Sequence, residues 1–188
     1  MKENLNEIAE IQFGPYLKGE LQGTTKYLLA SHFDELNRPS LFIASYVELE
    51  SNESSLLQSN DVILAGKGQR TFAWAYDEKF GPAVPSSLFF IIRTNPDQVN
   101  GKYLASFLNS EKIQHQIKLI AGGHSIPSIP KKELLQLKVN IPSIEKQMEF
   151  VEMAELMEED VRLAELLLTK KKEMRKTILN KMIDKQIK

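Results

Sequence analysis

The sequence contains no cysteine and no run of about 20 apolar residues of the kind that crosses a membrane. Without cysteine, a disulfide scaffold and a thiolate metal site are both excluded. The amino terminus, MKENLNEIAEI, is acidic and lacks an apolar core, so no secretory signal is expected. With 188 residues, of which 42% are hydrophobic, the chain suits one domain with an appendage. We therefore expect a cytoplasmic protein without a membrane span.

Signatures of catalysis are missing as well. The three histidines, His32, His115 and His124, are scattered, and no pair has the spacing of metal ligands. The chain has no phosphate-binding P-loop and no nucleophile motif of the form GxSxG. The sequence thus predicts a protein that is not itself an enzyme and has no metal and no cofactor of its own.

Residues 1–142 are predicted to form one domain of mixed α and β structure, mostly strands. Short apolar runs bounded by polar or turn residues indicate strands at 25–31, 40–47, 61–66, 71–76 and 86–93. Helical spacing indicates helices at 101–110 and 111–120, and Asn4 is a candidate cap for a short helix that includes Leu5, Ile8 and Ile11. Residues 134–142, LLQLKVNIP, alternate apolar and polar positions and are interpreted as a half-buried strand.

Residues 143–188 are predicted to form one long coiled-coil helix, which makes the expected fold class α+β. Neither glycine nor proline occurs after Pro142, and Ser143 is a candidate cap. Apolar residues recur at steps of four and three, as in a coiled-coil seam: Phe150, Ala154, Met157, Val161, Ala164, Leu168, and then Ile178 and Met182. A helix of about 40 residues extends about 60 Å, too far to fold back on a small domain. Its stripe therefore needs a partner.

This seam is interrupted at Lys171 and Arg175. Leu167 and Met174 are candidates to carry the apolar stripe past the gap by a stutter. The helix is also divided by charge: residues 145–165 hold eight acidic and two basic residues, and 170–188 hold two acidic and eight basic ones. Parallel pairing of two copies would place like charges together, whereas antiparallel pairing places opposite charges together. The charge pattern therefore favours an antiparallel pair, and the alternative is a solvated helix with local Glu–Lys pairs.

The stretch at 122–147, GGHSIPSIPKKELLQLKVNIPSIEKQ, followed by a long amphipathic helix, resembles the joint of the specificity subunits of type I restriction-modification systems. The residues that carry this resemblance are Gly122, Gly123, Ile126, Ile129, Leu134, Ile141, Pro142 and Gln147. Upstream, SNDVILAGKGQR at 59–70 is similar to the family's Gly-Asp-Val-Leu segment, with Asn60 in place of the usual glycine. YLASFLNS at 103–110 is similar to its short helix after the last large strand.

The resemblance implies a DNA target recognition domain over residues 1–142, with the helix of residues 143–188 as spacer and dimerisation arm. The familiar subunit carries two such domains and two antiparallel helices, so this chain looks like a half-subunit. Two copies would then read an inverted repeat in double-stranded DNA. The implied partners are the methyltransferase subunits, which bring S-adenosylmethionine, and the motor-nuclease subunits, which hydrolyse ATP and cleave. The rival interpretation is a non-catalytic interaction or scaffold protein that oligomerises through its coiled coil.

Two loops and a dipeptide offer side chains for reading DNA, which requires donors and acceptors for base edges and cations for phosphates. The predicted DNA-binding residues are Lys18, Thr24 and Lys26 in the loop at 16–26; Lys67, Gln69 and Arg70 in the loop at 65–71; and His124 and Ser125. For each group the alternative is an ordinary surface loop or turn with solvated side chains. Phe72, Trp74 and Tyr76 alternate along a predicted strand and are interpreted mainly as packing residues.

Overall fold

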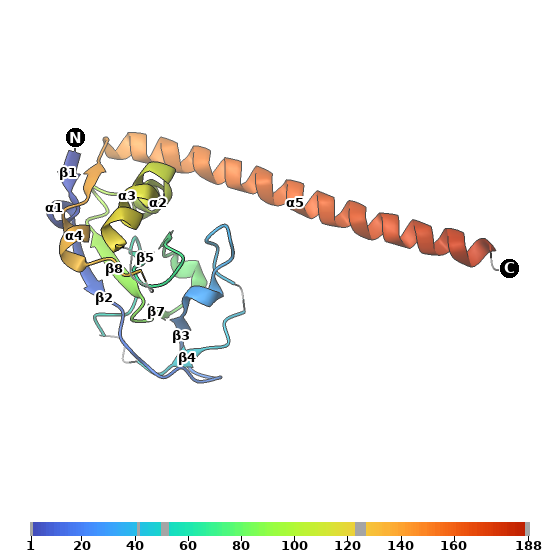
Figure 1. Ribbon diagram of the computed structural model, residues 1–188, viewed down its shortest axis with the longest axis horizontal. Helices are drawn as coiled ribbons and strands as arrows, with labels where there is room; N and C mark the ends of the chain where they lie inside the picture. Colours follow the sequence, from blue (N-terminus) through green and yellow to red (C-terminus); the bar gives the residue numbers. More distant parts are fainter. Residues whose placement is uncertain (1, 41, 50–52, 123–126, 187–188) are drawn as a thin grey trace. The chain divides into compact units, whose positions relative to one another are not determined.

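The computed structural model describes the chain except for residues 1, 41, 50–52, 123–126 and 187–188. It divides into two compact units, Met1–Met148 and Glu149–Lys188 (Figure 1). The first is globular and contains every strand of the described part of the chain. The second consists of helix α5 after its first turn.

The centre of the globular unit is an antiparallel four-stranded sheet in the order β2-β8-β5-β6. Its strands are β2 (Ala9–Phe13), β8 (Phe89–Thr94), β5 (Val62–Ala65) and β6 (Ala73–Ala75). All four residues of β5 are buried, as expected of a strand that is covered on both faces. The predicted strands at 61–66, 71–76 and 86–93 therefore belong to this sheet.

Alternate residues of the sheet point into two separate cores, because successive side chains of a strand face opposite ways. Val62 and Leu64 pack with helices α2 (Gly101–Asn109) and α3 (Glu111–Ala121), the two helices that the sequence predicted. Ile63 and Ala65 pack on the other face with an aromatic cluster formed by Phe33, Phe72, Trp74, Phe80 and Phe89. The predicted packing role of Phe72 and Trp74 matches this second core.

Smaller sheets complete the globular unit. A three-stranded sheet has the order β4-β3-β7, from β4 (Tyr46–Val47), β3 (Thr25–Leu28) and β7 (Ala83–Pro85). Strand β1 (Lys2–Asn4) pairs with β9 (Lys138–Asn140) and brings the amino terminus beside the residues that precede α5. Two 3-10 turns, η1 (Ala30–His32) and η2 (Glu78–Phe80), flank the aromatic cluster.

The sequence-based prediction was wrong in three places. The strand predicted at 40–47 is reduced to Tyr46–Val47. The short helix near the amino terminus, α1 (Leu5–Ile8), ends before Ile11, which lies in β2. The strand predicted at 134–142 is instead helix α4 (Lys131–Leu135) followed by β9. Leu134, Leu137 and Val139 are buried there: the first two are three residues apart, which is helical spacing, and the last two are two apart, which is strand spacing. The predicted mixed α+β class with a long carboxyl-terminal helix is nevertheless confirmed.

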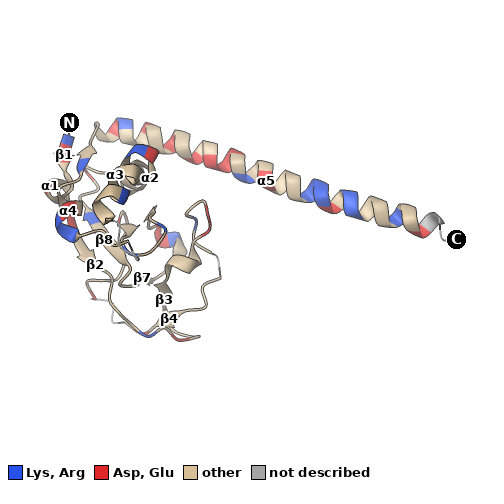
Figure 2. Ribbon diagram, viewed as in Figure 1, with Lys and Arg blue, Asp and Glu red and all other residues tan. Residues whose placement is uncertain are grey.

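Helix α5 (Ile144–Gln186) has 43 residues, as the unbroken run without glycine or proline predicted. Its acidic residues gather in the first half and its basic residues in the second (Figure 2). Apolar side chains of the predicted seam are exposed, among them Phe150 at 47%, Met157 at 63% and Met182 at 56%. Local ion pairs also occur, between Arg162 and Glu159 and between Lys170 and Glu173. These two pairs are local contacts of the general kind that the alternative, a solvated helix with local ion pairs, predicts.

The first turn of α5 belongs to the globular unit and is fastened there by a buried glutamine. Gln147 has no exposed surface. Its side-chain oxygen accepts a hydrogen bond from Asn100 N at 2.9 Å, and its amide nitrogen donates to the carbonyls of Gln98 and Pro142, each at 2.9 Å. With these partners, the buried amide of Gln147 has its hydrogen bonds made, and it fixes the positions of the residues to which it is bonded.

No helix in the described part of the chain is long and apolar enough to cross a membrane. Within the same residues, no group of three or more histidine and acidic side chains is placed to hold a metal ion.

Candidate nucleic-acid interface

Two of the predicted DNA-binding loops begin at the same end of the four-stranded sheet. Strands β2 and β5 both flank β8, and both end opposite its beginning. Immediately after them, Gly14 N donates to the Phe89 carbonyl at 3.0 Å, and Gly66 N donates to the Leu88 carbonyl at 2.8 Å. The loops at 16–26 and 65–71 are therefore brought together by strand pairing, although they are about 50 residues apart in the sequence.

Residues 127–129 join the loop at 65–71 through backbone hydrogen bonds. Gly68 N donates to the Pro127 carbonyl at 3.0 Å, and Ile129 N donates to the Gly66 carbonyl at 2.8 Å. Residues 127–129 follow the GGHS stretch after one intervening residue, Ile126. His124 and Ser125 themselves lie outside the described residues. The loop at 65–71 and residues 127–129 thus meet beside Lys67, close to Phe13 at the end of β2.

Lys67 is exposed at this meeting point, between two glycines that the geometry requires. A side chain at position 66 would place its Cβ 2.3 Å from the ring of Phe90, and Gly68 has a φ of +114°. The Lys67 ammonium lies 5.2 Å from the centre of the Phe13 ring, which in turn contacts Phe90. A cation over an aromatic face keeps most of its hydrogen-bonding capacity free for a further anion. Lys67 therefore suits a phosphate.

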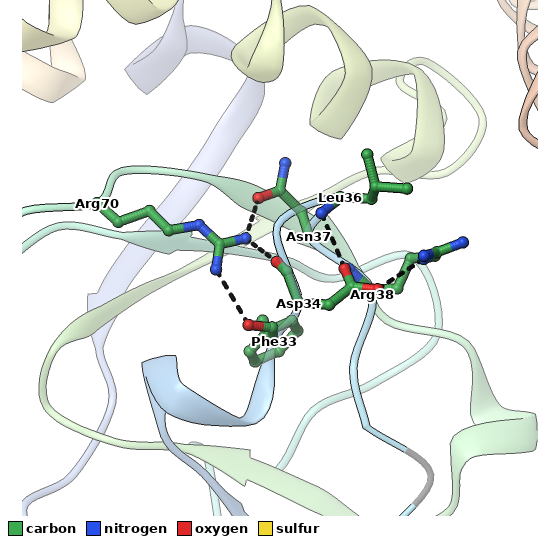
Figure 3. A network of polar contacts seen from close by, with 6 residues as sticks. All are labelled: Phe33, Asp34, Leu36, Asn37, Arg38 and Arg70. Atoms are coloured by element: carbon green, nitrogen blue, oxygen red, sulfur yellow. Dashed lines mark hydrogen bonds and ion pairs between the residues drawn. The ribbon is translucent and has the colours of Figure 1, made fainter. Parts of the chain in front are cut away.

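Arg70, predicted to bind DNA, makes contacts within the protein (Figure 3). Its guanidinium donates to the Phe33 carbonyl at 3.0 Å, to Asn37 Oδ1 at 2.6 Å and to the Asp34 carbonyl. It also stacks on Phe72, with its central carbon 4.6 Å from the ring centre. These contacts hold Arg70 against the turn at 34–38. A bidentate contact with guanine would require the same fork of donors. Its neighbour Gln69 is exposed.

The turn that Arg70 holds is itself highly ordered. The Asp34 carboxylate accepts hydrogen bonds from Leu36 N at 2.9 Å, from Arg38 N at 2.8 Å and from Arg38 Nε at 2.8 Å. Burial pushes the pKa of Asp34 upward, but the hydrogen bonds from Arg38 and Leu36 outweigh it, and the pKa lies below its ordinary value. Asn37 adopts the left-handed conformation with a φ of 63°, which asparagine tolerates well. The sequence analysis missed this turn, although DELNRP carries the asparagine and proline typical of one.

The remaining predicted residues lie apart from this meeting point. Thr24 donates its hydroxyl to Glu48 at 2.8 Å. The Lys26 ammonium donates to the carbonyl of Phe80 and lies 4.0 Å from the centre of that ring. Both residues therefore have partners in the protein that compete with DNA. Lys18 is exposed on the loop between β2 and β3.

Sequence reasoning also missed three exposed apolar residues, one at the end of β2 and two on the loop that follows it. Phe13 is 43% exposed, Tyr16 89% and Leu21 82%. The sequence analysis treated their surroundings as a source of polar donors only. Two features of the sequence could have indicated them: Tyr16 follows Gly-Pro, and Leu21 stands between polar residues. Residues at such loop positions rarely belong to a core.

Comparison with known proteins identifies the group to which this arrangement is related. Residues 1–175 match the family model described as the type I restriction modification DNA specificity domain. No curated protein matches the chain.

Three solved structures share its fold. The type I restriction-modification S subunit from M. genitalium has a TM-score of 0.60 and 14% identity, and the match covers 85% of this chain and 39% of that one. For the HsdS subunit from Thermoanaerobacter tengcongensis the values are 0.59, 16%, 86% and 38%. A chain from a structural study of assembly and conformational transition in the type I R-M system gives 0.58, 16%, 86% and 39%. This chain thus spans about two fifths of the length of these proteins.

Proposed function

Because the chain belongs to the family of type I restriction modification DNA specificity domains, we propose that its globular unit binds a specific sequence in double-stranded DNA. The observation that carries this proposal is the meeting of the loop at 65–71, residues 127–129 and the end of β2 beside the exposed Lys67, at one end of the central sheet. Loops on a rigid sheet are the usual place for binding residues. In this arrangement Lys67 neutralises a phosphate, and Gln69 hydrogen-bonds to a base edge, with adenine as the natural match. Lys18 adds a further cation on the neighbouring loop.

The salt dependence of binding tests this assignment. Each phosphate contact releases counterions, so the logarithm of the binding constant falls linearly with the logarithm of the salt concentration. We expect Lys67→Gln to weaken binding to a duplex and to reduce this slope by about one. Lys118→Gln is the matched control, since Lys118 is an exposed lysine on α3. Fluorescence anisotropy with a labelled duplex measures both. Equal slopes for wild type and Lys67→Gln would remove Lys67 from the interface, and binding that does not depend on salt would favour the scaffold alternative.

We infer further that helix α5 pairs in antiparallel orientation with a second copy of itself. The predicted seam is symmetric about position 166. Phe150 and Met182 lie equally far from that position, as do Ala154 and Ile178, and Ala164 and Leu168. An antiparallel pair centred there sets each small residue against a large one, which is how facing seam positions fill space.

Charge supports the same register. Position 166 also separates the acidic half of α5 from the basic half (Figure 2). In the antiparallel pair Lys171 faces Val161, and Arg175 faces Met157. Glu158 and Asp160 lie next to those apolar residues. The two basic residues that interrupt the seam, Lys171 and Arg175, thereby lie beside acidic residues of the other helix. Each such ion pair contributes a few tenths of a kcal/mol to stability when it is exposed.

The absence of cysteine makes the register directly testable. We expect a mixture of Ala154→Cys and Ile178→Cys chains to form an intermolecular disulfide under mild oxidation, whereas neither variant alone does so. Parallel pairing would instead cross-link Ala154→Cys to itself. Wild-type protein in sedimentation velocity should move as a dimer at micromolar concentration. A strictly monomeric species there would contradict the pairing.

A second apolar stripe runs beside the seam on α5. Its members are Met153, Leu156, Leu163, Leu167 and Met174, all about half exposed or more. A helix with two adjacent stripes suits a bundle of more than two helices. We assign this stripe to the methyltransferase and motor-nuclease subunits of a type I restriction-modification complex, which would supply S-adenosylmethionine, ATP hydrolysis and cleavage. Co-purification with the methyltransferase subunit, lost in Leu156→Lys but kept in Glu155→Lys, tests this assignment.

A further inference from the structure

The loop between β2 and β3 exposes two large apolar side chains to an unusual degree. Tyr16 is 89% exposed and Leu21 is 82% exposed, within a globular unit that buries most of its aliphatic and aromatic residues. Exposed apolar groups in an anchored loop commonly mark a binding surface.

The loop is held in place by the body of the protein, so these side chains do not fold inward. Tyr27 anchors its first part: the Tyr27 hydroxyl donates to the Pro15 carbonyl at 3.2 Å and accepts from Leu17 N at 3.1 Å. Glu20 anchors its second part, because its backbone N–H and carbonyl both bond to Tyr46, each at 2.8 Å. Tyr16 lies between the first two anchors, and Leu21 directly follows the last. Because the loop is already ordered in the free protein, binding of a partner does not require the further loss of entropy that ordering the loop would cost.

Glycines let the loop approach the body this closely. A Cβ at Gly14 would lie 2.3 Å from the Pro85 carbonyl oxygen, and one at Gly23 would lie 2.9 Å from the Tyr46 side chain. The loop therefore has little freedom to shift and bury its apolar side chains against its own domain.

Its position connects the loop to the proposed DNA surface. It follows Phe13, the last residue of β2, whose ring centre lies 5.2 Å from the Lys67 ammonium, and Lys18 stands between Tyr16 and Leu21 in the sequence. Glu20 is the acidic residue of the loop. A surface that combines cations with protruding apolar side chains is the design of proteins that insert a wedge between stacked bases and kink the duplex.

We propose that Tyr16 and Leu21 form an apolar wedge that enters the minor groove and unstacks a base step of the DNA bound by the globular unit. This inference rests on the proposed DNA-binding function and adds the mode of contact. Tyr16 stacks on an exposed base, and Leu21 fills the space that opens at the step. The affinity then depends on how easily that base step deforms. Flexible pyrimidine–purine steps are favoured, because they cost the least free energy to open.

The test uses the full chain and a duplex obtained by selection from random-sequence DNA, with 2-aminopurine placed at successive adenines. We expect wild-type protein to raise the fluorescence at one step, as unstacking does, and to shorten the distance between dyes on the duplex ends. Tyr16→Ala should abolish both signals and weaken binding about 5- to 150-fold, the range for loss of one base–aromatic stack. Tyr16→Phe should retain them.

Matched controls separate the wedge from general effects. Phe42→Ala removes an aromatic ring that is 91% exposed elsewhere, and it should leave the fluorescence, the bend and the affinity unchanged. Because Tyr16 is exposed, its replacement should leave the thermal unfolding temperature unaltered. If wild type binds the duplex but Tyr16→Ala and Leu21→Ala match it in all three signals, the wedge is refuted and DNA binding stands. If they match it on DNA but lose a protein partner of the complex, the loop is a protein-docking site and the wedge is again refuted. If wild type does not bind DNA at all, the proposed function fails as well.

Discussion

Replacing Gln147 by leucine removes the three hydrogen bonds that fasten the first turn of α5 to the globular unit. Leucine is similar in volume to glutamine, so the variant leaves little cavity and isolates the polar contribution. In the variant, the N–H of Asn100 and the carbonyls of Gln98 and Pro142 lose the hydrogen-bond partner that the Gln147 side chain provides in the wild type. At about 0.5–1.5 kcal/mol per hydrogen bond, the expected loss of unfolding free energy is about 2–4 kcal/mol. That is a large fraction of the stability of a domain of this size.

Trp74 provides the assay. It is the single tryptophan of the chain and lies in the aromatic cluster of the globular unit, so its fluorescence reports on that unit and not on α5. Urea unfolding followed at this residue gives the free energy for wild type and variant. A difference below about 0.5 kcal/mol would mean that water or relaxed backbone replaces these bonds, and the reasoning from burial would be refuted.

A second variant at the same position adds a pH dependence. In Gln147→Glu one carboxylate oxygen still accepts from Asn100 N, but the other faces the two carbonyl oxygens without a proton to donate. Burial there raises the pKa of the introduced carboxyl above its unfolded value. The variant is therefore most stable at low pH, and the deficit grows as pH rises from the unfolded to the folded pKa. A deficit that does not change with pH would contradict this placement.

Three further outcomes follow from buried or ordered polar contacts in the globular unit. Asp61→Asn, which removes the charge paired with Arg93 at 2.7 Å, should lower the unfolding free energy by about 2–3 kcal/mol in urea, less than for a fully buried pair because Arg93 is 28% exposed. His32 accepts from Leu29 N through Nδ1, and burial lowers its pKa, so stability should fall as pH drops below the ordinary value of 6.5; His32→Asn, which keeps an acceptor that does not titrate, should flatten this fall in pH-dependent thermal unfolding. Arg70→Lys keeps the charge but loses the fork, so amide exchange in the turn at 34–38 should quicken by more than tenfold, while the salt slope of DNA binding stays the same.

The regular elements were predictable because their signals are local. The apolar run VILA indicated a strand, and the stretch after Pro142 without glycine or proline indicated α5. The strand predicted over LLQLKVNIP was correct only at Lys138–Asn140, because a short segment can satisfy both periods, and burial of Leu134 against the core favoured a helical turn at its start. Local patterns thus give the type of a long element more reliably than that of a short one.

The site was predictable only in part, since its geometry depends on distant pairs. The sequence pointed to Lys67 and its loop, but not to the pairing of that loop with residues 127–129. Arg70 looked like a base reader because nothing near it in the sequence reveals that Phe33 and Asn37, more than 30 positions away, take its donors. Gln147 belonged to a recognisable motif, yet its partner Asn100 is 47 positions away.

Whether the chain recognises a specific DNA sequence is tested by selecting duplexes from random-sequence DNA with the purified chain and sequencing them. We expect enrichment of one motif, with half-sites in inverted repeat at a fixed spacing, because two copies joined by antiparallel helices present two identical reading surfaces. Recovery of unenriched sequences at the salt concentration at which the protein still binds would show that it recognises phosphates alone, and the specificity assigned to its converging loops would be contradicted.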